Sequence, residues 1–216
     1  IRPKYAILDP SLTLSCPKGP TISAGVDSLV HATEAFVAKK TNPMARLFAK
    51  EGFKLVFENL PILVNDLEDI ELREKVMYGA FLSAIALMNS GTGPAAAMSY
   101  PLGVHYGVPH GIGGGIFLPF VVEHNIKQGF YEYGEMFYLA DNKKISKKEK
   151  SVLFLNYLKD TWSSLDVPKN LNMFGLNRDG ITNFVNDTMD LKGALGQNPV
   201  IFLKNEIQKV LQCLIG

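Results

Sequence analysis

Charged side chains are missing from a long central part of this sequence. Residues 76–122 contain no Asp, Glu, Lys or Arg. Glycines and prolines interrupt the span, and its longest apolar run, Val76–Met88, is shorter than the roughly 20 residues that cross a bilayer. We therefore expect buried helices and no membrane association. His105 and His110 are then polar groups in the driest part of the protein, where each needs a partner.

A net charge is also lacking. The 216 residues include 22 Lys plus Arg and 21 Asp plus Glu, so no overall field would attract nucleic acid. The single basic cluster consists of Lys143, Lys144, Lys147, Lys148 and Lys150. Glu149 interrupts it and no aromatic residues are interleaved, so we expect a solvated helix start rather than a binding patch.

Cysteine is scarce. Cys16 and Cys213 lie near opposite ends of the chain, in no metal or redox spacing. This pattern favours a reducing compartment, and hence a cytoplasmic location, or simple packing, although it also allows one disulfide. No secretory signal is visible. Because the chain starts with Ile1 instead of methionine, we expect a fragment or a processed product of a longer protein.

Strand-like alternation is limited to Tyr5–Leu8 and Leu12–Leu14, whereas helical patterns recur. Thr21 or Ser23 is the expected cap of the first helix, and Asn42 that of the second. The predicted helices are 21–40, 43–59, one after the acidic residues 66–71, Phe130–Ala140, Lys147–Leu165, Arg178–Asp187 and Val200–Leu214. The fold class is therefore all-α, with residues 1–20 as an extended interdomain lead and residues 21–216 as one helical domain.

Asp27 and His31 are four residues apart in the first predicted helix. They share a face and can hold one metal ion between them, although the same spacing also occurs in surface hydrogen-bonded pairs. Glu34 lies three residues further on. It is either a hydrogen-bonding partner of this pair or, as we favour, a solvated side chain.

The second candidate is His110, in the sequence Pro109-His110-Gly111. This tripeptide is typical of a tight turn that leads into a helix, and His110 is either a ligand or a hydrogen-bonded core residue. The glycines at 113–115 have no preceding strand and no following Lys-Ser or Lys-Thr pair, so a phosphate-binding loop is not indicated. We interpret them as sites where a helix packs closely on a neighbour.

The segments LDPSLTLSCP, AGVDSLVHATEAF and SYPLGVHYGVPHG, in this order, resemble the C-terminal domain of the iron-type (group III) alcohol dehydrogenases over nearly the whole chain. The resemblance implies an all-helical domain that holds divalent iron or zinc. It faces an N-terminal α/β domain, missing from this chain, that binds NAD or NADP. Asp27, His31 and His110 match three metal ligands. The fourth, a histidine in the family, is Ala96 here, and a further active-site histidine is Tyr100.

The resemblance implies an enzyme that interconverts a small-molecule alcohol and its aldehyde or ketone, and a chain that is inactive without the nucleotide-binding domain. Tyr100 is then a proton donor or a packed aromatic, and His105 faces the cleft or is buried structure. Leu12 and Thr13 are the expected cofactor contacts. The segment AAMSYPLGVH resembles a branch that includes the 3-deoxy-octulosonate 8-oxidases, which implies a bulky anionic sugar-acid substrate.

Two alternatives stay open. Because alanine has no donor atom, Ala96 is also consistent with a helical binding or scaffold domain that has lost its metal. Enzymes of the dehydroquinate-synthase type share the architecture, although the Pro-Leu-Gly and Pro-His-Gly elements favour the dehydrogenase.

An apolar cleft face that no partner domain covers would favour a homodimer.

Overall fold

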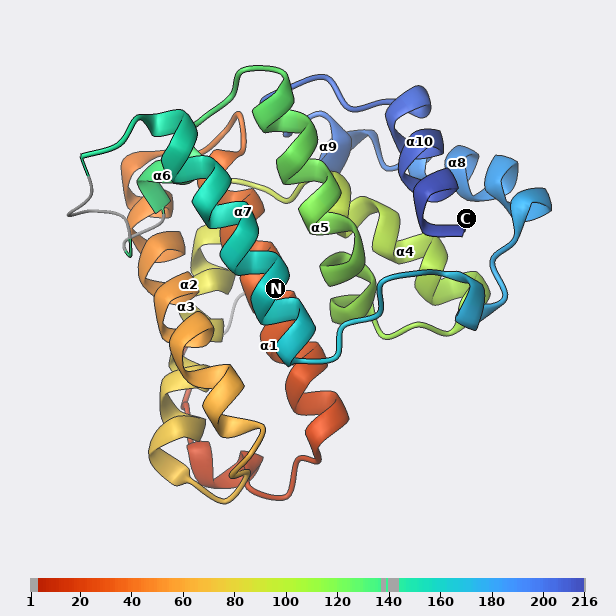
Figure 1. The fold of residues 1–216 in the computed structure, drawn as a ribbon. Coiled ribbons are helices and arrows are strands. Elements are labelled where there is room, and N and C mark those ends of the chain that lie inside the picture. Colours follow the sequence, from red (N-terminus) through yellow and green to blue (C-terminus); the bar gives the residue numbers. More distant parts are fainter. Residues whose placement is uncertain (1–3, 137–138, 140–143, 216) are drawn as a thin grey trace.

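The computed structural model describes residues 4–136, 139 and 144–215, and this part of the chain is helical without any strand (Figure 1). The helices are α1 (Lys18–Val37), α2 (Pro43–Leu63), α3 (Ile70–Asn89), α4 (Pro94–Tyr106), α5 (His110–Lys127), α6 (Tyr133–Met136), α7 (Lys147–Ser164), α8 (Ile181–Asp190), α9 (Lys192–Leu195) and α10 (Lys204–Ile215). Short 3-10 helices lie at Pro10–Thr13, Asn172–Phe174 and Arg178–Gly180. The all-α prediction is confirmed. No helix in the described part is long and apolar enough to cross a membrane.

Local capping explains where several helices begin. The Asn42 side chain accepts a hydrogen bond from the backbone N–H of Ala45, and Pro43 is the first residue of α2, as predicted. Asp69 caps α3 by accepting from the N–H groups of Glu71 and Leu72. Each cap satisfies donors that would otherwise have no partner in the first turn.

The basic cluster begins a helix, as predicted. Ser146 and Glu149 form a reciprocal capping box at the start of α7. Lys144, Lys147 and Lys148 are exposed, and Lys147 pairs with Glu135. Lys143 lies outside the described residues. The observed residues of the cluster therefore form a solvated helix start.

Several predicted boundaries were wrong. Tyr5–Leu8 is irregular and exposed instead of a strand, and Leu12–Leu14 belongs to a 3-10 turn because Asp9 caps the N–H of Ser11. The first helix begins at Lys18, earlier than the expected caps, and α2 continues past Pro61 to the buried Leu63. In the C-terminal part, residues 178–180 form a 3-10 turn before α8, and α10 starts only at Lys204. Within the described part of Phe130–Ala140, the only α-helix is α6.

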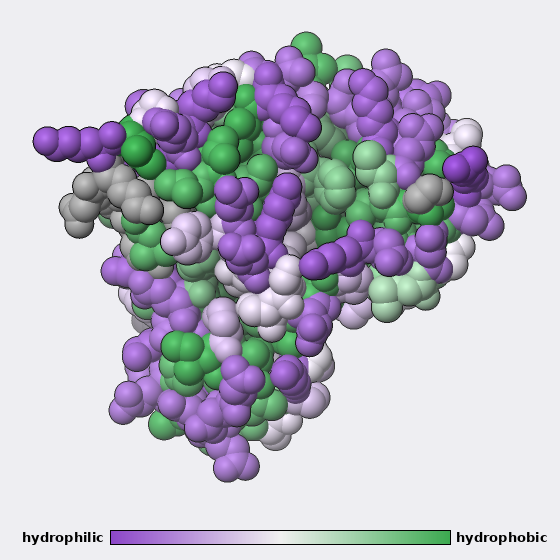
Figure 2. All heavy atoms as spheres, in the orientation of Figure 1, coloured by the Kyte–Doolittle hydropathy of each residue, from purple (hydrophilic) through white to green (hydrophobic). Residues whose placement is uncertain are grey.

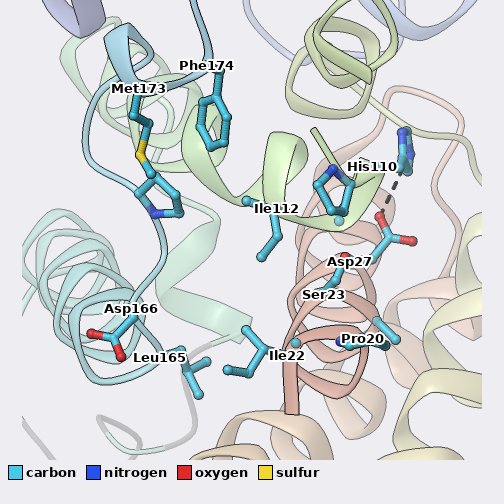
Figure 3. A pocket seen from close by; sticks show the side chains of 15 residues that line it. Pro20, Ile22, Ser23, Asp27, His110, Ile112, Leu165, Asp166, Met173 and Phe174 are labelled. Carbon is cyan, nitrogen blue, oxygen red and sulfur yellow. Dashed lines mark ion pairs between the residues drawn. The ribbon is translucent and has the colours of Figure 1, made fainter. Parts of the chain in front are cut away.

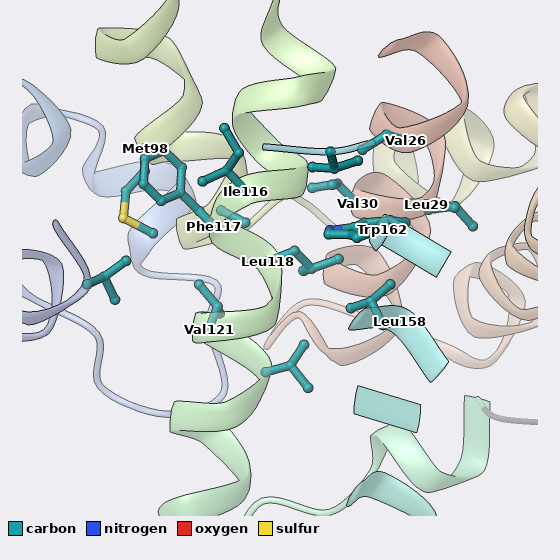
Figure 4. Packing of buried hydrophobic residues seen from close by; sticks show 14 of the residues in the cluster. Val26, Leu29, Val30, Met98, Ile116, Phe117, Leu118, Val121, Leu158 and Trp162 are labelled. Atoms are coloured by element: carbon teal, nitrogen blue, oxygen red, sulfur yellow. The ribbon is translucent and has the colours of Figure 1, made fainter. Parts of the chain in front are cut away.

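Helix α1 lies at the centre of the packing. It contacts α2 and α3 on one side and α5 on the other, while α4 and α7 pack on α5 (Figure 1). Figure 4 shows Val26, Leu29 and Val30 of α1 in the same apolar cluster as Phe117 of α5 and Trp162 of α7. The face in Figure 2 is mostly hydrophilic with separate hydrophobic patches, as expected for a folded protein surface.

Helices α1 and α5 approach each other closely because α5 begins with glycines. A Cβ on Gly111 would lie 2.0 Å from the carbonyl oxygen of Ser23, and one on Gly115 would lie 2.5 Å from Cγ1 of Val26. Any larger residue would push the helices apart. The packing role predicted for the glycine run is confirmed, and it fixes the first residue of α5, His110, against α1.

Candidate metal centre

Asp27, His31 and His110 form one cluster at the contact between α1 and α5. Asp27 and His31 are one turn apart on α1, and His110 is the first residue of α5 after the cap at Pro109. Oδ1 of Asp27 lies 3.6 Å from Nε2 of His31 and 3.8 Å from Nε2 of His110. One potential ligand atom from each of the three residues falls within a mutual distance of 4.8 Å. The two histidines, 79 positions apart in the sequence, are therefore joined through one carboxylate.

The donor set fits a divalent metal. Ligand atoms about 2.0–2.2 Å from a tetrahedral zinc ion are roughly 3.3–3.5 Å from one another, so the distances of 3.6 Å and 3.8 Å need only small side-chain adjustments. Two imidazoles and a carboxylate suit zinc and iron alike. The side chains keep 21–37% of their surface exposed, which leaves one side of the cluster accessible to a further ligand.

The surroundings of His31 lower the pKa of its ring and so favour the neutral form. Burial lowers the pKa of His31, and the nearby His110 lowers it further, while the Asp27 carboxylate raises it by less than burial lowers it. A neutral imidazole keeps a lone pair for a metal, whereas an imidazolium has none. The environment therefore prepares His31 for ligation at neutral pH.

Ser99 on α4 orients His110 and was missed by the sequence analysis. Its buried hydroxyl donates to the carbonyl oxygen of Ala96 at 2.6 Å, and its oxygen lies 2.7 Å from Nδ1 of His110. Since the single hydroxyl proton is used on Ala96, Nδ1 of His110 donates to Ser99. Nε2 then carries the lone pair and faces Asp27. The spacing of residues in the sequence does not predict this contact, because Ser99 and His110 lie on different helices.

Glu34 is buried, so the favoured expectation of a solvated side chain was wrong. Its carboxylate accepts hydrogen bonds from the Thr92 hydroxyl at 2.8 Å and from the N–H groups of Gly93 and Ala95 at 2.7 Å each. These groups form the N-terminus of α4, where a negative charge is stabilised. Burial nevertheless raises the pKa of Glu34 to about 7, because its effect is larger than that of these hydrogen bonds, which lower the pKa. Glu34 thereby fixes the turn that contains Ala96.

The other predicted site residues lie in different surroundings. The Tyr100 ring packs against His110 with a centroid separation of 4.8 Å, and 53% of the residue is exposed. His105, at the far end of α4, pairs instead with Asp187 of α8 at 2.7 Å and is half-exposed. Ala96 is buried, and its carbonyl oxygen accepts the hydrogen bond from Ser99. Tyr100 is thus beside the cluster, whereas His105 has a separate partner.

Leu12 and Thr13, the predicted cofactor contacts, line a cavity of about 390 Å³ together with residues of α1 and α3. Leu12 is 81% exposed. Arg73 also lines the cavity, and its guanidinium donates to the carbonyl oxygens of Leu67 and Cys16 and to the hydroxyl of Thr21. Cys16 and Cys213 are both free thiols.

A larger cavity of about 750 Å³ opens directly beside the cluster (Figure 3). We call it the apolar pocket. Asp27 and His110 form one side of it, and Leu165, Met173 and Phe174 belong to the segment from the end of α7 onward. A ligand group at the cluster therefore has adjoining space for the rest of its molecule.

The comparisons with known proteins agree with this geometry. Residues 21–215 match the sequence model described as "Fe-containing alcohol dehydrogenase family, C-terminal". The chain belongs to this family. The family and the C-terminal domain expected from the motifs are confirmed.

Three relatives illustrate the family. The NAD-dependent methanol dehydrogenase of Bacillus methanolicus is 40% identical over 126 residues, which cover 58% of this chain and 33% of the relative. Long-chain-alcohol dehydrogenase 1 of Geobacillus thermodenitrificans is 27% identical over 96% of this chain and 53% of its own length. The structure of sulfoacetaldehyde reductase from Bifidobacterium kashiwanohense in complex with NAD+ gives a TM-score of 0.89 at 27% identity, covering 99% of this chain and 55% of that one. The chain thus spans a third to about half of the length of these relatives.

Proposed function

We propose that this chain is the metal-holding part of an NAD(P)-dependent alcohol dehydrogenase that interconverts an alcohol and its aldehyde or ketone. The observation that carries the proposal is the convergence of Asp27, His31 and His110 in a member of this family. Iron and zinc both suit the donor set, and both remain candidates. The family match supports this reaction over that of the dehydroquinate-synthase type.

Each residue of the cluster has a distinct part. When bound, a divalent cation supplies Lewis acidity that lowers the pKa of an alcohol, and a nicotinamide supplies the hydride acceptor. Asp27 provides the negative charge that attracts the cation. His31 is kept neutral by burial, and Ser99 keeps the Nε2 lone pair of His110 pointed at the cluster. With three protein ligands, a bound cation would keep a position for water or substrate.

Tyr100 is our candidate for holding the proton that the alcohol oxygen exchanges. Its ring lies against His110 and more than half of the residue is exposed, so its hydroxyl has room to reach a ligand beside the cluster. The alternative is packing alone. The pairing of His105 with Asp187 supports a structural role for His105 in place of the catalytic one.

The cofactor is proposed to contact Leu12 and Thr13 here and to rest mainly on an N-terminal α/β domain that this chain does not contain. The length difference from the relatives supports this division, because this chain spans 53–55% of relatives that it matches nearly end to end. We therefore expect no dehydrogenase turnover from the 216 residues alone. A cytoplasmic location and a homodimer also remain proposals.

Zinc titration of the metal-free chain by calorimetry tests the proposal. We expect one site per chain, with affinity reduced at least a hundredfold in Asp27→Ala, His31→Ala and His110→Ala. His124→Ala is the matched control, because this histidine bonds to the carbonyl oxygen of Ile201 and lies outside the cluster. Its affinity should equal that of the wild type.

The second candidate function is a binding or scaffold domain without metal. The observation that favours it is the buried Ala96, which offers no side-chain donor at the position of the expected fourth ligand. Absence of zinc and iron binding in the wild-type chain would support this candidate and reject the dehydrogenase. Binding that the three alanine variants leave unchanged would reject the proposed site.

A further inference from the structure

We infer that the apolar pocket binds the substrate and selects a neutral alcohol or aldehyde with an apolar tail against an anionic one. The inference deepens the proposed function, on which it rests, by naming the substrate class. The family does not settle this class, since the relatives named above include a long-chain-alcohol dehydrogenase and a sulfoacetaldehyde reductase. The lining of the pocket in this chain is therefore the informative feature.

The pocket continues from the candidate metal centre to an apolar rim. In Figure 3, Asp27 and His110 lie at one side of the pocket, and Met173 and Phe174 lie at the opposite side. A volume of about 750 Å³ is within the usual range of small-molecule sites. A hydroxyl group at the cluster would thus direct the remainder of its molecule toward Met173 and Phe174.

Hydrocarbon surface dominates the walls. The larger apolar side chains that line the pocket include Pro20, Ile22, Ile112, Leu165, Met173 and Phe174. Met173 is 67% exposed, so its surface is available to be covered by a ligand. An alkyl tail placed there would remove apolar surface of both partners from water, which is favourable.

The charges around the pocket disfavour an anion. Among the described residues that line it, Asp27 and Asp166 are acidic and His110 is titratable, while no Lys or Arg is present. A carboxylate tail would lose water against the apolar walls without gaining a cationic partner. It would also face Asp166. This lining argues against the anionic sugar-acid substrate that the motif AAMSYPLGVH implied.

Methionine-methyl NMR of the 216-residue chain tests the inference without turnover. The chain is labelled with 13C at the methionine methyls and titrated with 1-hexanol or with 6-hydroxyhexanoate, which differ only in the tail terminus. We expect the Met173 signal, assigned from Met173→Ser, to shift with 1-hexanol at a dissociation constant at least tenfold below that for 6-hydroxyhexanoate. Met44, also exposed but outside the pocket, is the internal control and should not shift.

Asp166→Asn probes the charge with little risk to the fold, because asparagine tolerates the positive φ of 54° at this position. The variant should bind 6-hydroxyhexanoate several-fold more tightly and 1-hexanol as before. The inference is overturned if the Met173 signal does not shift with 1-hexanol, or if it shifts with the same dissociation constant for both compounds. Zinc titration reports on the metal centre separately, so failure of the proposed function and failure of the inference give different results.

Discussion

The hydroxyl oxygen of Ser99 lies 2.7 Å from Nδ1 of His110 and joins the fourth helix to the first residue of the fifth. Because the hydroxyl proton is donated to Ala96, the serine acts as an acceptor for the imidazole. One small polar residue thus sets which nitrogen of His110 faces the cluster. Hydrogen bonds to the second nitrogen of a ligating histidine commonly tune metal affinity.

Ser99→Ala should weaken zinc binding by about 10-fold to 100-fold, the usual effect of losing such a partner. Calorimetric titration of the metal-free chain measures the change. In addition, 15N NMR of the histidine ring should show His110 losing its single tautomer even without metal. Ser83→Ala is the matched control, since this buried hydroxyl donates to the carbonyl oxygen of Gly79 in α3. Wild-type affinity in Ser99→Ala would contradict the positioning role.

Ala96→His should strengthen zinc binding by about tenfold or more, because a fourth protein ligand completes a tetrahedral set. Ala96 lies in the first turn of α4, whose residue Ser99 already contacts His110. Ala96→Phe adds similar bulk without a donor atom and should bring no gain. If both variants bind zinc alike, position 96 does not reach the metal centre.

Gly111→Ala should lower the free energy of unfolding by about 1–3 kcal/mol, the typical cost of overpacking. The new Cβ would lie 2.0 Å from the carbonyl oxygen of Ser23 and would force α5 away from α1. Gly19→Ala is the control, because nothing lies within 4 Å of its Cβ and the residue is helical. That change should stabilise the protein by about 0.5–1 kcal/mol. Urea denaturation measures both.

Glu34 should make the protein less stable as the pH rises from about 4.5 to about 7. The pKa of its carboxyl is raised from 4.5 to about 7 in the native state, so within this window the native state keeps a proton that the unfolded state releases. A pKa difference of this size corresponds to about 3 kcal/mol between the ends of the window. Urea denaturation of the metal-free chain at several pH values measures the slope.

Glu34→Gln isolates this effect, since the variant has no titrating group at the position. The difference in unfolding free energy between wild type and variant should therefore change with pH across the window. Glu123→Gln, which removes a partly exposed carboxylate paired with Lys127, should leave the slope as in the wild type. Parallel slopes for the wild type and Glu34→Gln would show that Glu34 does not titrate in this range.

Helical periodicity and helix caps can be predicted from the sequence because they depend on local residues. The Asn42-Pro43 start, which was predicted and is confirmed, and the Ser146–Glu149 capping box, which was not predicted, each depend on residues within one turn. The start of α1 at the exposed Lys18 was not predicted, and neither was the continuation of α2 past Pro61, which places Leu63 in the buried interior. Glu34 illustrates the same limit. Its partners are 58 or more residues away, in the first turn of another helix and the two residues before it.

The sequence by itself determined the all-α class, the pairing of Asp27 with His31 one helical turn apart, and membership of the family through ordered motifs. Only the tertiary structure brought His110 to that pair. The glycines of α5 allow this helix to approach α1 closely, and the spacing of residues in the sequence does not predict that approach. The pocket beside the cluster is likewise lined by segments that are far apart in the sequence. These segments meet only when the apolar core assembles, because the burial of side chains from distant parts of the chain, rather than local preference, sets the positions of the segments.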